Sequence, residues 1–370
     1  MKRVMAGLAA LLAGAATAQA QEARPFEVTS ADGTVVHGQA DLPAQPNGVA
    51  VVMVWGSGAF DRDVRLGRTG TDRDLLFKDI AARMNAHGVT AVRFDRRGIR
   101  HGETGMAAID GPVAVTATTE AVRDDLAAVY DWTRAEAGLG ARCVVLFGHS
   151  EGMAHIGRLA SAGAPAPDLV LGMGALMQSP VEVVRWQSTG RDAHSLALMD
   201  ADGDGVTTNA EVEANWRSTP SAVFNRLDLL LAPDGAWTAE DLEAVRTAQT
   251  RLYEANREQS LAQADDAPYP SALTRFAPYQ WWKSWFLDET PIAERLAAWD
   301  APVRLHYGDK DSQTVAEHQA EAARAALPAE RLSVEIHAGR GHSLGEDVLM
   351  GPIDETLADR LAQEAAAACG

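Results

Sequence analysis

Continuous apolar runs alternate with segments of helical periodicity through the first half of the chain and again near its end. The runs are short, and their apolar residues are continuous rather than alternating, which is typical of strands buried on both faces of a parallel sheet. The segments between them repeat apolar residues at helical spacing, which predicts amphipathic helices. The predicted strands are residues 47–58, 88–98, 141–152, 168–175, 301–311 and 331–344, and the predicted helices are 74–88, 119–138, 314–327 and 354–368. We therefore expect an α/β fold with a mostly parallel sheet covered by helices on both faces.

The alternation stops for about a hundred residues in the second half of the chain. Residues 178–277 are polar and helical, with no strong strand pattern. The simplest interpretation is one α/β domain that is interrupted by a helical insertion. We expect a first core segment at 21–177, the insertion at 178–277 and a second core segment at 278–370.

The first twenty residues have the pattern of an export signal. Lys2 and Arg3 precede an apolar run, and Ala18-Gln19-Ala20 offers a cleavage site of small residues. The alternative is a membrane anchor, but the run is short and rich in alanine and glycine. We expect cleavage after Ala20, a periplasmic or secreted protein, and no later membrane span.

Charge and cysteine content narrow the possible partners. The formal net charge of −18 argues against binding to nucleic acid and to anionic membrane surfaces. An oxidising compartment would permit a disulfide between Cys143 and Cys369. Cys143, however, opens a predicted buried strand, and Cys369 lies next to the C-terminus. We therefore favour two unpaired thiols, neither of them catalytic.

One strand turns directly into a helix with a serine at the corner. Gly148-His149-Ser150-Glu151-Gly152 has the G-x-S-x-G spacing of a nucleophile elbow, in which the glycines allow close backbone approach and the serine hydroxyl is exposed. The alternative is an ordinary glycine-rich turn. If the elbow is correct, amides at the start of the following helix face a developing negative charge.

A nucleophilic serine requires a base and an acid, which follow this elbow in the order acid, then histidine. Asp311 lies three residues after Gly308 at the end of the strand 301–311, and we prefer it to Asp309 as the acid. His342 follows the last strand on a glycine-containing loop, and we predict it as the general base, with His337 as a weaker candidate. His149 is interpreted as structural.

An oxyanion hole requires two backbone N–H donors. We predict the N–H of Glu151, directly after the nucleophile, and the N–H of Ser57 in the loop after strand 47–58. Gly56 and Gly58 free the backbone of this loop to approach the serine, although a plain glycine turn is the alternative.

The chain resembles the α/β-hydrolase superfamily, and within it the bacterial acyl-esterases and serine-aminopeptidase-like hydrolases. The resemblance is carried by WGSGAFDRD, DRRGIRHG and GHSEGM, over residues 26–175 and 285–365. Departures from the usual motifs are Trp55, Arg100, Gly102 and Met153, none of which removes a catalytic group. The resemblance implies hydrolysis of esters or amides through an acyl-enzyme, without a cofactor, and an insertion that serves as a cap over the acyl pocket.

The insertion carries a twelve-residue acidic loop, DADGDGVTTNAE. It matches the EF-hand calcium loop, with acidic residues at positions 1, 3, 5 and 12 and glycine at position 6. Thr207 at position 8 departs from the usual aliphatic residue. The segment around Asp234-Gly235 echoes the loop, but Leu230 and Ala232 cannot be ligands, so it is at most a degenerate partner. The predicted calcium ligands are Asp200, Asp202, Asp204, Val206 through its carbonyl, Thr208 and Glu211. The alternative is a solvated acidic turn.

Aromatic residues follow the insertion at helical spacing. Trp281, Trp282, Trp285 and Phe286 lie at positions i, i+1, i+4 and i+5. We favour packing of the cap against the core over a substrate wall for this group.

Together these patterns predict a secreted serine hydrolase, most simply a carboxylesterase for small or medium acyl esters, with a cap stabilised by calcium. A peptidase or amidase of the same fold is one alternative. A non-catalytic, calcium-dependent binding module is another, although a pure binder has no need of Ser150, Asp311 and His342 together.

Overall fold

The structure is a computed structural model that describes residues 22–67, 69–216, 230–269, 276–345 and 352–370. Within these residues, eight strands form one sheet in the order β1-β2-β4-β3-β5-β6-β9-β10. Strand β2 is antiparallel to β1 and β4, and the other neighbours are parallel. The strands are β1 (Glu22–Thr29), β2 (Val35–Leu42), β3 (Val49–Val54), β4 (Thr90–Phe94), β5 (Cys143–His149), β6 (Leu169–Met173), β9 (Val303–Gly308) and β10 (Leu332–His337).

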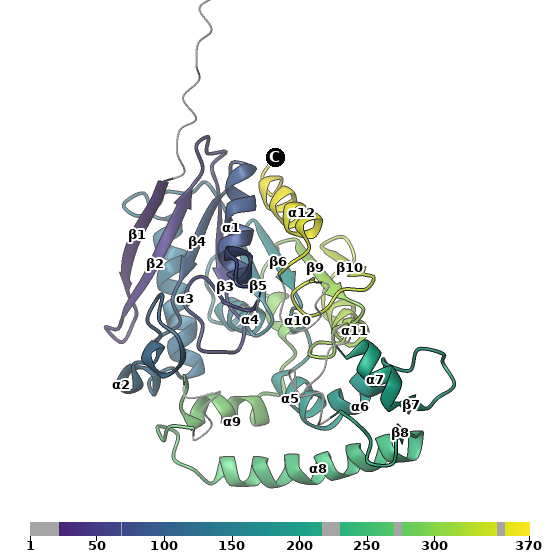
Figure 1. Ribbon diagram of the computed structural model, residues 1–370. Helices are drawn as coiled ribbons and strands as arrows, with labels where there is room; N and C mark the ends of the chain where they lie inside the picture. The colour runs from purple at the N-terminus through teal and green to yellow at the C-terminus, as the bar shows by residue number, and fades with distance from the viewer. Residues whose placement is uncertain (1–21, 68, 217–229, 270–275, 346–351) are drawn as a thin grey trace, which may run out of the picture.

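Helices cover both faces of this sheet (Figure 1). Helix α1 packs against α12, and α4 packs against α3 and α10. The helices of the core are α1 (Leu76–Ala86), α2 (Gly111–Ala114), α3 (Thr119–Arg134), α4 (Gly152–Ser161), α10 (Ile292–Leu296), α11 (Ala316–Ala326) and α12 (Glu355–Ala366), with 3-10 turns η1 (Asp72–Asp74) and η2 (Gly105–Ala108). The predicted alternation is explained by burial: all residues of β3, β4, β5 and β6 are buried.

The remaining helices lie together below the sheet in Figure 1, at the end opposite to the C-terminus. They are α5 (Pro180–Thr189), α6 (Arg191–Ala197), α7 (Asn209–Asn215), α8 (Ala239–Leu261) and α9 (Tyr279–Leu287), with the short strands β7 (Thr207–Thr208) and β8 (Ala236–Trp237). A small apolar cluster that includes Leu196, Val212 and Leu242 joins α6, α7 and α8. We refer to α5 to α9 as the cap.

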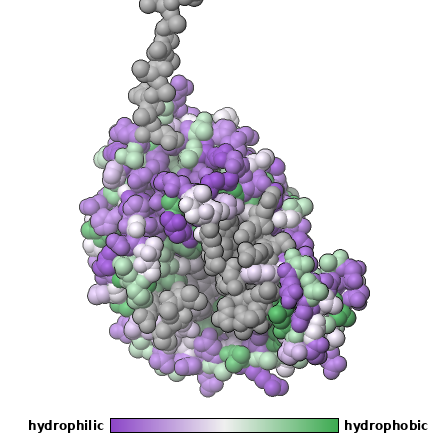
Figure 2. All heavy atoms as spheres, viewed as in Figure 1, coloured by the Kyte–Doolittle hydropathy of each residue, from purple (hydrophilic) through white to green (hydrophobic). Residues whose placement is uncertain are grey.

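Export and membrane anchoring are not decided by the fold. Residues 1–21, with the predicted signal, lie outside the described residues. No helix within the described residues is long and apolar enough to span a membrane. The face shown in Figure 2 is mostly hydrophilic outside the grey atoms, and its hydrophobic residues form small separate groups.

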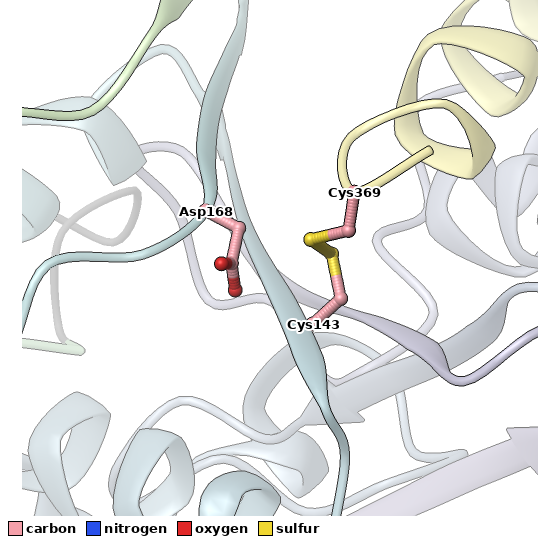
Figure 3. A group of neighbouring side chains, drawn as sticks. All are labelled: Cys143, Asp168 and Cys369. Atoms are coloured by element: carbon pink, nitrogen blue, oxygen red, sulfur yellow. A yellow bond between two sulfur atoms is a disulfide. The ribbon is translucent and has the colours of Figure 1, made fainter.

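The two cysteines form a disulfide, so the expectation of unpaired thiols is wrong. Figure 3 shows Cys143 at the start of β5 joined to Cys369, which follows α12. Helix α12 packs on β3 and β6, the neighbours of β5 in the sheet. It therefore brings the C-terminus back to the start of β5, where Cys143 lies. Asp168, also in Figure 3, accepts a hydrogen bond from the Val144 N–H, 2.7 Å from its Oδ2.

Candidate active site

Ser150 lies at a sharp corner between β5 and α4. Its φ is 54°, in the left-handed region that a residue with a Cβ rarely adopts. The flanking glycines make this corner possible. A Cβ on Gly152 would lie 2.1 Å from the carbonyl oxygen of Val54, and one on Gly148 would lie 2.9 Å from the Met153 nitrogen. The segment therefore has the strained strand-to-helix geometry that exposes a serine hydroxyl.

Asp311 and His342 come together at the ends of β9 and β10. Oδ2 of Asp311 lies 2.8 Å from Nδ1 of His342. The Asp311 side chain is fully buried, and its carboxylate also accepts hydrogen bonds from the Gln313 and Thr314 amides and the Thr314 hydroxyl. Thr314 was missed by the sequence analysis, although its place three residues after an aspartate is typical of a local turn. The carboxylate is thus fixed to hold the imidazole through Nδ1.

The competing residues have other partners. Oδ1 of Asp309 accepts from the Gly339 N–H, 2.7 Å away. His337 lies 3.1 Å from His306 through its Nε2. His149 is buried behind the corner, and burial together with nearby His342 holds the pKa of its imidazole well below the usual value. A neutral, buried His149 fits the structural role expected for it.

The loop after β3 touches the serine corner. A Cβ on Gly56 would lie 3.0 Å from the Cβ of Ser150, a tight contact that a larger residue could make only if the serine corner shifted slightly. Ser57 lines the same cavities as Ser150. Glu151 is the N-cap residue of helix α4, at the end of the helix where the first backbone N–H groups lack partners within the helix. The two predicted oxyanion donors therefore flank Ser150 from separate segments.

A buried ionic network lies next to this corner. It could not be foreseen from the sequence, from which only the backbone of Glu151 was given a role. The Glu151 carboxylate accepts from Trp281 Nε1 of the cap at 2.6 Å. It lies 3.0 Å from His155 Nε2 and 3.5 Å from both terminal nitrogens of Arg96. Both charged side chains are fully buried. Burial alone would raise the pKa of Glu151, but the positive charge of Arg96 and the hydrogen bond with His155 lower it by more than burial raises it. The carboxyl therefore remains ionised.

Aromatic rings enclose the guanidinium of this network. The guanidinium carbon Cζ of Arg96 lies 4.6 Å from the ring centroid of Trp55 and 4.3 Å from the ring centroid of Phe276. Trp55, a departure from the usual histidine, therefore has a clear partner in this chain. Arg97 pairs instead with Asp32 and Asp125, away from this network.

The variant Glu151→Gln is expected to lower the free energy of unfolding by about 3–5 kcal/mol, because Arg96 would remain buried without its anionic partner. The folded-state pKa of Glu151 is lowered, so its stabilisation is present above the usual pKa of 4.5 and decreases as the pH falls below that value. The variant should lack this part of the pH dependence.

Denaturant unfolding between pH 7 and pH 4 measures both effects. The matched control is Glu254→Gln, because Glu254 is exposed on α8 and should change neither quantity. Equal stability of Glu151→Gln and the wild type would contradict the assigned role of this carboxylate.

Two cavities meet at Ser150. One, of about 160 Å³, is lined by residues that include His342, Gln313, Phe60 and Leu66. The other, of about 150 Å³, is lined mostly by apolar residues of the cap and core, together with Ser57, Ser150 and Gln187. Trp281, Trp282 and Trp285 lie in its wall, so the preference for packing alone is corrected: the aromatic group packs on the core and also lines the cavity.

The acidic loop of the cap lies between α6 and α7. Carboxylate oxygens of Asp200, Asp202 and Glu211 lie within 4.8 Å of one another. Asp204 is not part of this group, and its Oδ1 accepts from the N–H of Val206. The structure thus brings together three of the four predicted acidic ligands.

The segment around Asp234-Gly235, which the sequence suggested as a degenerate partner of this loop, pairs with it. Strands β7 and β8 are antiparallel, with Thr207 opposite Trp237. Each loop also closes on a capping box, Thr208 with Glu211 and Thr238 with Asp241. Thr207 and Trp237 both occupy position 8 of their loops, which is the position that bridges two EF-hands. The hydroxyl of Thr208, a predicted ligand, donates to Glu211.

No protein-family model matches the chain, and no curated protein matches it. A solved proline iminopeptidase from Mycobacterium smegmatis is similar, with a TM-score of 0.52 and 14% identity over 92% of this chain and 97% of that one. A putative aryl esterase from Burkholderia cenocepacia has a TM-score of 0.49 and 17% identity, over 93% and 99% of the two chains. An esterase from Rhodococcus sp. has a TM-score of 0.47 and 15% identity, over 94% of this chain and 99% of that one. Sequence identities this low show a shared fold and do not show a shared activity. The chain has the α/β-hydrolase fold, which confirms the predicted fold class.

Proposed function

We propose that the protein is a serine hydrolase that cleaves carboxylic esters through an acyl-enzyme on Ser150. The observation that carries this proposal is the contact of 2.8 Å between Asp311 and His342, at a cavity that His342 shares with the strained Ser150. A serine, an imidazole and a buried carboxylate in this order are the parts that acyl transfer requires. No metal or organic cofactor takes part in this chemistry.

In the proposed reaction, Nε2 of His342 removes the Ser150 proton as the hydroxyl oxygen attacks the ester carbonyl. Asp311 holds the imidazole through Nδ1 and stabilises the imidazolium that forms. Negative charge on the carbonyl oxygen is stabilised by the N–H groups of Ser57 and Glu151. His342 then protonates the leaving alkoxide, and water releases the acid by the same steps in reverse.

Covalent labelling with a fluorophosphonate, combined with hydrolysis of paired ester and anilide substrates, tests this function. We expect a label on Ser150 and faster turnover of the ester. Faster turnover of the anilide would assign the protein to the peptidase or amidase alternative. Absence of both label and turnover would contradict a serine hydrolase and leave a binding module.

We also propose that the cap binds calcium at the loop from Asp200 to Glu211. The donor set consists of oxygens, as calcium prefers, and the three clustered carboxylates fit one divalent cation. The pairing of β7 with β8 supports an EF-hand pair with one functional loop. Calcium would stabilise the helices on either side of the loop, and Ser150, Asp311 and His342 carry out the chemistry without it.

Chelation with EGTA is expected to lower the melting temperature modestly. Extracellular calcium modules bind at about 10⁻⁴–10⁻³ M, and at ten times such a Kd ligand binding contributes only about 1.4 kcal/mol. Glu211→Gln should abolish the difference between calcium and EGTA, whereas Asp241→Asn, at the matching position of the degenerate loop, should retain it. Calorimetric titration of chelator-treated protein decides the matter: no heat of binding up to several millimolar calcium would leave the loop as a solvated acidic turn.

We further propose that the protein is exported. The signal pattern before Ala20 supports this. The disulfide between Cys143 and Cys369 supports it independently, because such bonds persist in oxidising compartments. Mass determination of the secreted chain, which should begin at Gln21, tests the proposal.

A further inference from the structure

The two cavities at Ser150 differ in their walls. Of the residues that the structure describes, they share only Ser57, Ser150 and Gln187. The first, which we call the histidine lobe, includes His342, Ser343 and Gln313. The second, which we call the aromatic lobe, has no titratable side chain among the described residues that line it, and its remaining walls are Gly58, Leu176, Val184, Phe276, Trp281, Trp282 and Trp285.

The proposed reaction determines which part of an ester occupies each lobe. His342 must reach the oxygen of the leaving alcohol to protonate it. The alcohol therefore belongs in the histidine lobe. The acyl group, on the other side of the carbonyl carbon, must then enter the aromatic lobe.

The size of the aromatic lobe limits the acyl group. Its volume is about 150 Å³, and a cavity of about 150 Å³ with apolar walls accommodates one benzene ring. The wall is fixed by packing: Trp285 and Phe276 are at most 5% exposed, and Trp281 donates to the buried Glu151. An acyl chain that is much longer than a ring would have to displace these side chains.

The chemistry of the wall favours a flat, apolar group. The rings of Trp281 and Trp285 lie edge to face with centroids 5.7 Å apart, and those of Trp281 and Trp282 lie 4.9 Å apart. Aromatic pairs in such geometry contribute beyond the area that they bury. An aryl ring between these walls would gain this contribution, whereas an aliphatic chain would not.

On the basis of the proposed function, we propose that the substrates are esters of a compact aromatic carboxylic acid. The aromatic lobe holds the ring of a benzoyl-type acyl group, and the histidine lobe holds the alcohol. Val184 on α5 and Trp282 on α9 determine the acyl length, from two cap helices that pack against each other (Figure 1).

The acyl series of 4-nitrophenyl acetate, octanoate and benzoate tests this proposal on the full-length protein. Each kcat/KM is divided by the rate of hydroxide hydrolysis of the same ester, since benzoates are intrinsically less reactive. We expect benzoate to exceed octanoate by about tenfold or more, the range that misfit in an apolar pocket produces. An octanoate value equal to or above that of benzoate would overturn the proposal.

Two variants change the lobe in opposite directions. Trp282→Ala should raise the octanoate-to-benzoate ratio by about tenfold, and Val184→Phe should reduce turnover of benzoate by about tenfold more than that of acetate. Leu287→Ala is the matched control, because Leu287 lies on α9 but is 56% exposed. Unchanged ratios in both lobe variants would refute the assignment of the aromatic lobe.

The outcomes separate this inference from the function on which it rests. Turnover of all three esters without preference for benzoate would refute the acyl assignment and leave the serine hydrolase intact. Absence of fluorophosphonate labelling together with absence of turnover would refute both.

Discussion

Replacing Ser150 with alanine is expected to abolish ester turnover and fluorophosphonate labelling while the fold remains intact. Loss of the nucleophile of a serine triad reduces kcat by about 10⁶-fold, and what remains comes from the oxyanion hole and binding. The fold should survive because the substitution removes one partly exposed hydroxyl from the corner and leaves both glycines in place.

Stopped assays on purified protein, with circular dichroism and a melting curve, check this result. Ser161→Ala is the control, because Ser161 is exposed at the end of α4 and should behave as wild type. Retention of most activity in Ser150→Ala would remove the serine assignment.

The elements that could be predicted are those whose geometry depends on local sequence. The apolar runs predicted the buried strands because each strand carries its own pattern of burial. The corner at Ser150 was predicted because its glycines lie at a fixed spacing on either side of the serine, and the contact that requires Gly148 is with Met153 in the same turn, although the contact that requires Gly152 is with the more distant Val54. Asp311 and His342 could be placed near one another because the carboxyl ends of parallel strands lie along one edge of a sheet.

The features that were missed depend on segments far apart in the chain. The disulfide joins residues 226 positions apart, and its formation depends on where α12 returns to the sheet. The sequence gives no sign that Glu151, Arg96 and Trp281 converge, because they come from three separate segments that meet next to Ser150. The double role of the tryptophans likewise requires knowledge of which rings face the cavity at Ser150.

These long-range contacts link the cap to the candidate active site. Trp281 donates to the carboxylate of Glu151, the residue whose backbone N–H we propose as an oxyanion donor. Trp186 and Gln187 of α5 donate to the carbonyls of Ser312 and Gln313, directly after Asp311. The cap therefore contacts both the oxyanion side and the acid side of the site, in addition to forming a wall of the aromatic lobe.

Replacing Asp311 with asparagine is expected to reduce kcat by about 10⁴-fold, whereas Asp309→Asn should change it little. In Asp311→Asn, the amide oxygen can still accept from the Gln313 and Thr314 amides at the Oδ1 position. The amide nitrogen then takes the Oδ2 position and presents a donor to Nδ1 of His342. This forces the proton of the neutral imidazole onto Nε2, where it blocks removal of the Ser150 proton.

The two asparagine variants are matched in chemistry and lie two residues apart, so their comparison isolates the contact with His342. Asp309 accepts only from the Gly339 amide among the side-chain contacts of the described residues, and asparagine can accept that bond equally well. Steady-state kinetics on one ester, with fluorophosphonate labelling rates, should show the loss in kcat for Asp311→Asn alone. A larger loss for Asp309→Asn would identify Asp309 as the acid, because only one carboxylate can fix the tautomer of His342.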